Sequence, residues 1–282
     1  MKTTSKVIVV SSIILVLSLG FLLMQILGYK GESISAIDLS NEQKSTIITT
    51  PTKAIDKYSP NECLYALNGK IAISNYYKSN VTGTINASIV TQNVKNQKIK
   101  ANGNFFAETI STSSMVNVGK QTYYENGKVV LRDASDAKNN KWNTKLTVYD
   151  FDNYIKEYGV DQRELTNYIL NDDTIISSEL VSSTNDEYTF KYKLDTIKAT
   201  PFYKINMIKM GDLKSSPVFS SCEIIVTMKA NFEPISIECI DKYNVAQFGL
   251  KVQCSSHLTE TFSAFNDATI TIPNEELFKN EL

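Results

Sequence analysis

Histidine is almost missing from this chain, since only His257 occurs among its 282 residues. A single histidine excludes most catalytic and metal sites that depend on this residue. The sequence also lacks the Gly-x-Ser-x-Gly, His-Glu-x-x-His, phosphate-loop and Gly-x-Gly-x-x-Gly motifs. His257 follows Ser255 and Ser256 in an expected strand, which is typical of a surface or edge residue. A Ser–His–Asp site stays open at this point, because its members need not be adjacent in sequence.

Charge of one sign is lacking too, because the formal net charge is −1. No long basic stretch interleaved with aromatic residues occurs, so we do not expect nucleic-acid binding. Pairs of carboxylates occur at Asp133/Asp136, Asp150/Asp152 and Asp172/Asp173. These positions are typical of helix caps and loops, so we expect no metal ion and no cofactor.

The four cysteines include no Cys-x-x-Cys pair, which argues against zinc ribbons and thioredoxin-type redox chemistry. Cys239 and Cys254 fall in two adjacent expected strands. A turn centred near Ala246 and Gln247 would place them opposite each other. Two interpretations stay open: a cross-strand disulfide in an oxidising compartment, or buried free thiols.

One long hydrophobic run is present, at the start of the chain. Residues 7–28 carry no charge and are long enough to cross a bilayer as a helix, and Lys2 and Lys6 precede them. We expect residues 1–28 to be a transmembrane anchor, with an uncleaved signal as the alternative. The preceding lysines predict a single-pass protein of the cell membrane with its C-terminal part outside the cytoplasm. The polar segment 29–58 is expected to be a flexible tether.

The remainder, residues 59–273 followed by a tail at 274–282, shows one α+β pattern. Ser59, Pro60 and Glu62 form the capping signature of a helix. Period-two patterns then predict many antiparallel strands, with Asn126-Gly127 as the strongest hairpin signal. Helices are expected after Asp150, after Asp161 and after Thr200, and three long strands close the chain. Helices that interrupt a long meander predict one large curved antiparallel sheet.

The expected strands in VTGTINASIVTQNVKNQKIKANGNFFA have unusually small residues at the inward positions. Small residues on a concave face leave volume that either a helix or an apolar ligand fills. Aromatic residues of the mid-chain helices either pack as core or cover this volume as a movable lid. The candidate ligand-lining residues are Ile85, Ala87, Ile89, Ala101, Gly103, Phe105, Tyr154, Tyr158, Ile224 and Val226.

The order of these elements resembles the LolA-like lipoprotein-carrier superfamily, which includes the LppX-type lipoproteins. The resemblance covers about Ser59 to Pro273. It is carried by the capped helix before VTGTINASIV, the paired strands to Phe106, the segments DFDNYIKEYG and DQRELTNYIL, and the three closing strands. It implies an incomplete antiparallel β-barrel with helices on its concave side, which holds a lipid or a lipoprotein-like ligand. The apparent membrane anchor, in place of a free or lipidated N-terminus, departs from this family.

The sequence therefore predicts a membrane-tethered extracytoplasmic binding protein for a lipid or lipoprotein-like apolar ligand, and not an enzyme. The first alternative is an envelope sensor or assembly protein that binds another protein and has no ligand cavity. The second alternative is an envelope hydrolase.

Overall fold

The computed structural model describes residues 32–34, 37, 44–88, 90–114, 116–184, 186–247 and 250–282. The expected anchor, residues 1–28, lies outside this part of the chain, and so does Ile89. Within the described residues, no helix combines the length and the apolar character needed to span a bilayer.

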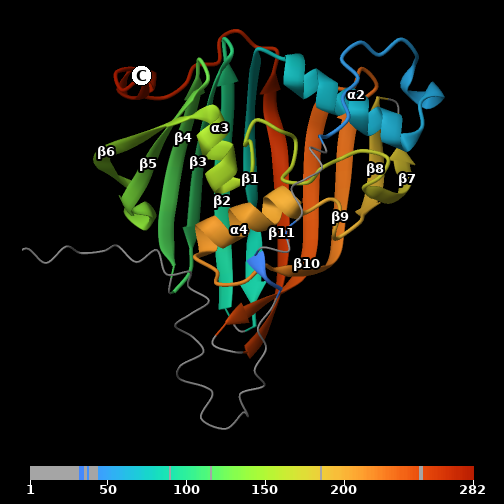
Figure 1. The fold of residues 1–282 in the computed structure, drawn as a ribbon. Coiled ribbons are helices and arrows are strands. Elements are labelled where there is room, and N and C mark those ends of the chain that lie inside the picture. Colours follow the sequence, from blue (N-terminus) through green and yellow to red (C-terminus); the bar gives the residue numbers. More distant parts are fainter. Residues whose placement is uncertain are drawn as a thin grey trace, which may run out of the picture.

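Eleven strands of the described residues form one antiparallel sheet (Figure 1). The sheet order is β6-β5-β4-β3-β2-β1-β11-β10-β9-β8-β7, so the first and last strands of the fold, β1 and β11, pair at its middle. The two edges, β6 and β7, stay unpaired with each other, and the sheet is open. The strands are β1 (Tyr76–Ala87), β2 (Val90–Ala101), β3 (Asn104–Thr112), β4 (Asn117–Glu125), β5 (Lys128–Asp136), β6 (Lys141–Asp150), β7 (Ile175–Ser183), β8 (Glu187–Leu194), β9 (Val218–Lys229), β10 (Pro234–Gln247) and β11 (Leu250–Phe265).

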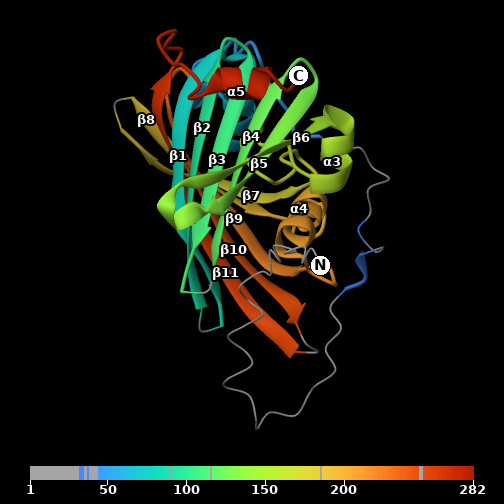
Figure 2. The same ribbon diagram turned by 90° about the vertical axis from the view of Figure 1, so that its left-hand side faces the viewer.

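The helices occupy different sides of this sheet. Helices α3 (Phe151–Tyr158) and α4 (Pro201–Gly211) lie against its concave face, and α2 (Pro60–Ile73) crosses one end of that face (Figure 1). The short α5 (Glu275–Lys279) lies on the opposite, convex side (Figure 2). This is the large open sheet with a few helices that the α+β pattern predicts, and it is consistent with an incomplete barrel.

Helix α2 begins at the position that its capping signature predicts. The Glu62 backbone N–H donates to the Ser59 hydroxyl, and the Ser59 backbone N–H donates to the Glu62 carboxylate at 2.7 Å. The helix ends at Ile73, because Ser74 takes an extended backbone. Most of its side chains are buried, including Leu64 and Leu67, so α2 fills one end of the concave face.

Part of the expected tether packs on the folded domain. The Ile48 backbone N–H donates to the Tyr65 carbonyl of α2 at 2.8 Å, and the Thr46 N–H donates to the Leu170 carbonyl at 2.8 Å. Gly69 lets this segment approach, because a Cβ there would lie 2.2 Å from the Ile48 carbonyl oxygen. The ordered domain therefore includes residues 44–58, ahead of Ser59.

The register of the opening strands differs from the expected one. Asn102 and Gly103, with φ of 50° and 85°, form the two-residue turn between β2 and β3. The period-two pattern alone predicts one strand that continues through this turn, with a connection near residues 93–97. Those residues instead lie inside β2. Across a two-residue turn, each even-numbered residue of one strand pairs with an odd-numbered residue of the other, and paired side chains share a face. The concave positions are therefore even-numbered in β2 and odd-numbered in β3.

The helix expected after Asp161 is wrong, and residues 161–173 form turns and bends. Side chains of this segment accept hydrogen bonds from nearby backbone N–H groups. The Arg163 N–H donates to the Asp161 carboxylate at 3.0 Å, and the Tyr168 N–H donates to the Thr166 hydroxyl at 3.2 Å. Such local bonds offer the backbone an alternative to a helix. We call residues 160–170 the covering segment, because it lies over the concave face.

Helix α3 forms as expected and ends at Gly159, whose φ is 80°. The expected cap at its start is wrong in detail. The Asp150 side chain makes no capping hydrogen bond to the helix, and its carboxylate pairs with Lys128 at 2.6 Å instead. Helix α4 begins at Pro201, as expected after Thr200.

Of the two interpretations of Cys239 and Cys254, the structure contradicts the disulfide, since all four cysteines are free thiols. Cys239 pairs across the strands with Leu258, and Cys254 pairs with Tyr243. The two cysteines are thus four positions out of register, about 13 Å along the strand, and a disulfide needs Cα atoms within about 7 Å. Strand β10 continues to Gln247, so the turn comes later than the sequence pattern suggests.

Two apolar clusters hold the layers together. The larger one lies on the concave side and joins α2, α3 and the covering segment to the sheet. The smaller one lies on the convex side, where Phe278 of α5 stacks on Tyr123 with ring centroids 5.4 Å apart. The expected tail, 274–282, is therefore in part a packed element. Phe278 is only 1% exposed.

Candidate functional site

A cavity of about 200 Å³ remains between the concave face and its helical cover. Strands β1 to β4, β10 and β11 form its floor, and α3, α4 and the covering segment form its roof. Figure 1 shows α3 and α4 in front of these strands. Its lining includes the apolar side chains of Val81, Val94, Val160, Leu165, Met210, Ile237 and Leu258.

The floor carries a buried ion pair. The Lys98 ammonium of β2 lies 2.8 Å from the Glu260 carboxylate of β11, and the two side chains are 12% and 8% exposed. The Ser79 hydroxyl donates to the other Glu260 oxygen at 2.6 Å. Both charges are therefore compensated inside the sheet face.

Tyrosines make up much of the roof. Tyr154 and Tyr158 of α3 stack with ring centroids 4.8 Å apart, and both are buried. Tyr168 of the covering segment and Tyr203 of α4 meet edge to face at 5.5 Å. Gln162 bridges roof and floor, because its side-chain amide donates to the Thr122 hydroxyl at 3.4 Å. The cover is thus fixed by ring contacts and a few polar bonds.

A second buried carboxylate, Asp241 of β10, lines the cavity near Tyr168 and Tyr203. It is 1% exposed. Its oxygens accept hydrogen bonds from the Tyr168 hydroxyl and from the Ser256 hydroxyl, the latter at 2.8 Å. Burial raises the pKa of Asp241 to about 6, and these hydrogen bonds oppose that rise. Within the described residues, Asp241 forms no ion pair.

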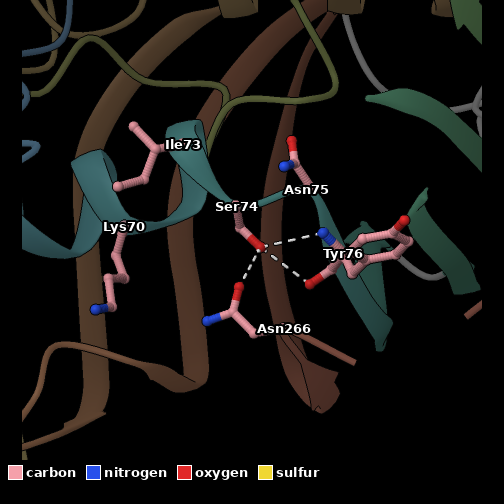
Figure 3. A pocket seen from close by; sticks show the side chains of 6 residues that line it. All are labelled: Lys70, Ile73, Ser74, Asn75, Tyr76 and Asn266. Carbon is pink, nitrogen blue, oxygen red and sulfur yellow. Dashed lines mark hydrogen bonds between the residues drawn. The ribbon is translucent and has the colours of Figure 1, made fainter. Parts of the chain in front are cut away.

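A second hollow, of about 260 Å³, lies at the surface where α2 ends (Figure 3). The Ser74 hydroxyl bonds there to the Tyr76 carbonyl at 2.9 Å and to the Asn266 amide oxygen at 3.0 Å, and it accepts the Tyr76 N–H at 3.3 Å. These bonds join the end of α2 to the start of β1 and to the end of β11. The Ser74 hydroxyl is used in that junction, so we assign the candidate site to the concave cavity.

The expected ligand-lining residues fall into three groups. Tyr154 and Tyr158 line the cavity. Ala87, Phe105, Ile224 and Val226 are buried in the concave core outside its lining, and Ile85 is half-buried on β1. Ala101 and Gly103 are not on the concave face, because the Asn102–Gly103 turn puts Gly103 in the loop and Ala101 in the convex cluster.

The charged lining residues were absent from the expected set: Lys98, Lys120, Glu164, Asp241 and Glu260. The even-numbered register of β2 decides which of its polar side chains face inward. The two-residue turn at Asn102-Gly103 was the signal that could have revealed it. Asp241 lies on the same face as Ile237 and Cys239, so the alternation in β10 also indicated its burial.

The single histidine lies away from this cavity. The His257 ring is bound to Glu238 at 3.0 Å, and its side chain is 55% exposed. Ser256 and Asp241 face the cavity side of the sheet, and the alternation of the strand points His257 to the other side. These residues therefore do not form a Ser–His–Asp arrangement.

No protein-family model matches the chain, and no curated protein matches it. Among solved structures, it is similar to a DUF1329 family protein from Desulfovibrio piger. The two are 9% identical with a TM-score of 0.27, and the match covers 78% of this chain and 100% of the other. A likeness at this level carries no argument about function, which must therefore be inferred from the concave cavity.

Proposed function

We propose that this chain is a binding protein that holds an apolar or amphipathic ligand, such as a lipid or an acyl chain, against the concave face of its sheet. The cavity under α3, α4 and the covering segment carries this proposal. Its apolar floor around Val81, Val94 and Leu258 suits a hydrocarbon chain, and its few polar groups suit one head group. The resemblance to lipoprotein carriers points in the same direction.

The cover must move for a ligand of lipid size. The cavity measures about 200 Å³, whereas pockets for drug-sized ligands measure about 300–1,000 Å³. Helices α3 and α4 contact each other, and the Asn206 side chain of α4 donates to the Tyr158 carbonyl of α3 at 3.0 Å. We therefore expect α3, α4 and the covering segment to lift together, which lengthens the cavity along the sheet.

The apolar run at residues 7–28 supports the location we propose, outside the cytoplasm and anchored to the cell membrane. Catalysis is not part of the proposal. The residues of the cavity bury the ligand, and the tyrosines of α3 provide the surface that closes over its hydrocarbon chain.

Extraction of co-purified lipid tests the binding function. The full chain is isolated in nanodiscs of one synthetic lipid after expression in cells, and the extract is analysed by mass spectrometry. We expect a stoichiometric lipid of cellular origin with the wild type. The variant Val94→Phe fills the cavity from the floor and should lose that lipid. Equal recovery from both proteins would count against the proposal.

One observation favours the protein-binding alternative. Strand β7 is an edge strand with exposed apolar residues, and Ile176, Leu180 and Val181 are 61%, 50% and 56% exposed. An open edge can accept a strand from another protein. Crosslinking in native membranes separates the two functions: a defined partner lost in Val181→Lys but retained in Val94→Phe would support this alternative.

A further inference from the structure

The two buried carboxylates that line the cavity are compensated differently. Glu260 has the Lys98 ammonium at 2.8 Å and the Ser79 hydroxyl at 2.6 Å. Asp241 has only neutral partners: the hydroxyl groups of Tyr168 and Ser256, and the Cys222 thiol and Tyr203 hydroxyl, which also lower its pKa by hydrogen bonding. A buried charge without a countercharge is costly, and proteins normally pair it.

The cations that line the cavity are already engaged. Lys98 belongs to Glu260, and Lys120 pairs with Asp133 at 2.7 Å while its ammonium lies 5.4 Å from the centre of the Tyr158 ring. Glu164, the remaining carboxylate of the lining, is exposed on one side, and desolvation raises its pKa to about 7. In the part of the chain that the structure describes, nothing cationic is left to offset Asp241.

Aromatic rings stand beside this carboxylate. Tyr168 and Tyr203 meet edge to face at an interplanar angle of 86°, and both line the cavity together with Asp241. Ring faces attract cations, and recognition of quaternary ammonium groups uses such surfaces. A carboxylate without a countercharge and two tyrosine rings thus converge on one end of the cavity.

We propose that the ligand of this cavity carries a cationic nitrogen, an amine or a quaternary ammonium, which binds at Asp241 beside Tyr168 and Tyr203 while its apolar part lies along Val81 and Val94. This inference rests on the proposed binding function and names its ligand class. An anionic head group would meet Asp241 and Glu164 without a free cation to receive it.

Affinity for such a ligand should increase with pH. The pKa of Asp241 is about 6, and a cation binds its ionised form. The groups that face it are Tyr168, Tyr203 of α4, Ser256 of β11, Cys222 of β9 and Cys239 of β10. Burial raises the pKa of each of the tyrosines and cysteines among them, so none of these ionises between pH 5 and 7. Glu164 of the covering segment lines the same cavity, and burial and the nearby Asp161 raise its pKa to about 7, so the comparison with Asp241→Asn must separate the two carboxylates.

Calorimetric titration of the full chain in nanodiscs, corrected with empty nanodiscs, tests this inference. The probes are hexyltrimethylammonium, hexanol and hexanoate, whose short chains limit partition into the bilayer. We expect the cation to bind at least tenfold more tightly than hexanol, and hexanoate to bind most weakly. Asp241→Asn should remove the preference for the cation and retain hexanol binding. Glu238→Gln, on the other face of β10, should change neither.

The pH dependence is measured with the wild type and with Asp241→Asn, which keeps Glu164 and should lose most of the increase in affinity expected of the wild type. Between pH 5 and pH 7 the affinity for hexyltrimethylammonium should rise about tenfold, as the ionised fraction of Asp241 does, while the affinity for hexanol stays constant. If hexanol or hexanoate binds as tightly as the cation, or if Asp241→Asn keeps the preference, the cationic ligand is ruled out and the binding function stands. If none of the three probes binds, both proposals fail.

Discussion

Asp241 and Glu260 show at the level of single residues how this sheet buries charge. Glu260 shares an ion pair with Lys98, and both are nearly excluded from solvent. Asp241 is equally buried and relies on hydroxyl donors from Tyr168 and Ser256. The Glu260–Lys98 pair stabilises the fold. The ionised Asp241 destabilises it at neutral pH, and it provides a charged group in the cavity.

The variant Asp241→Asn tests that cost through the pH dependence of unfolding. In the folded state the pKa of Asp241 is about 6, above its ordinary value of 3.8. The folded state therefore binds the proton more tightly, and the stability from this group is fully present below about pH 4 and is lost as the pH rises through about 6. The loss at pH 7 is of the order of 3 kcal/mol.

Urea unfolding of both proteins between pH 4.5 and 7.5 measures this effect. The difference in unfolding free energy between variant and wild type should shift in favour of the variant as the pH rises. A constant difference over this range would show that Asp241 is not the group responsible.

The Lys98–Glu260 pair gives the opposite expectation. Glu260→Gln leaves the Lys98 ammonium, 12% exposed, without its countercharge, and should cost about 3 kcal/mol of unfolding free energy. The double variant Lys98→Met, Glu260→Gln removes both charges and should recover part of that loss. Equal stability of wild type and Glu260→Gln in urea unfolding would contradict the structural role of the pair.

At the scale of elements, short sequence motifs predict helix starts and turns correctly where the side chains of the motif bind or restrict the adjacent backbone. The Ser59–Glu62 capping box, the Asn126–Gly127 turn and the Pro201 helix start all correspond to elements of the structure. The helix expected after Asp161 failed, because Asp161 and Thr166 bind nearby backbone N–H groups and Tyr168 is drawn to Asp241. That last bond joins positions 73 residues apart, which no local pattern reveals.

The Asn102–Gly103 turn determines which side chains of β2 face the cavity, so its chemistry has consequences for the site. Gly103 has a φ of 85°, and a Cβ there would meet nothing within 4 Å. Gly103→Ala should therefore act through the backbone alone and cost about 1 kcal/mol, since alanine disfavours positive φ.

Chemical denaturation of Gly103→Ala measures this cost. The matched variant Asn102→Gly keeps a residue that accepts positive φ and should change stability by only a few tenths of a kcal/mol. If Gly103→Ala were neutral, the two-residue turn assigned between β2 and β3 would be incorrect.

At the scale of the whole molecule, the sheet pairs its first and last strands at the centre and leaves its edges open. Period-two patterns and hairpin signals were sufficient to predict this curved antiparallel sheet. They were not sufficient for the site, because the cavity depends on the strand register and on a covering segment without regular structure. Tyr154 and Tyr158 were found from helix periodicity, whereas Lys98 and Glu260 belong to strands that are far apart in sequence and meet only through β1.

The most direct test of the account is photolabelling of the full chain with a neutral alkyl alcohol that carries a diazirine, followed by peptide mapping. We predict adducts on the floor strand β2 and on the roof helix α3, and their loss in Val94→Phe but not in Val148→Phe, which changes an exposed residue of β6. Adducts confined to other surfaces, or labelling unaffected by Val94→Phe, would contradict ligand binding in the concave cavity.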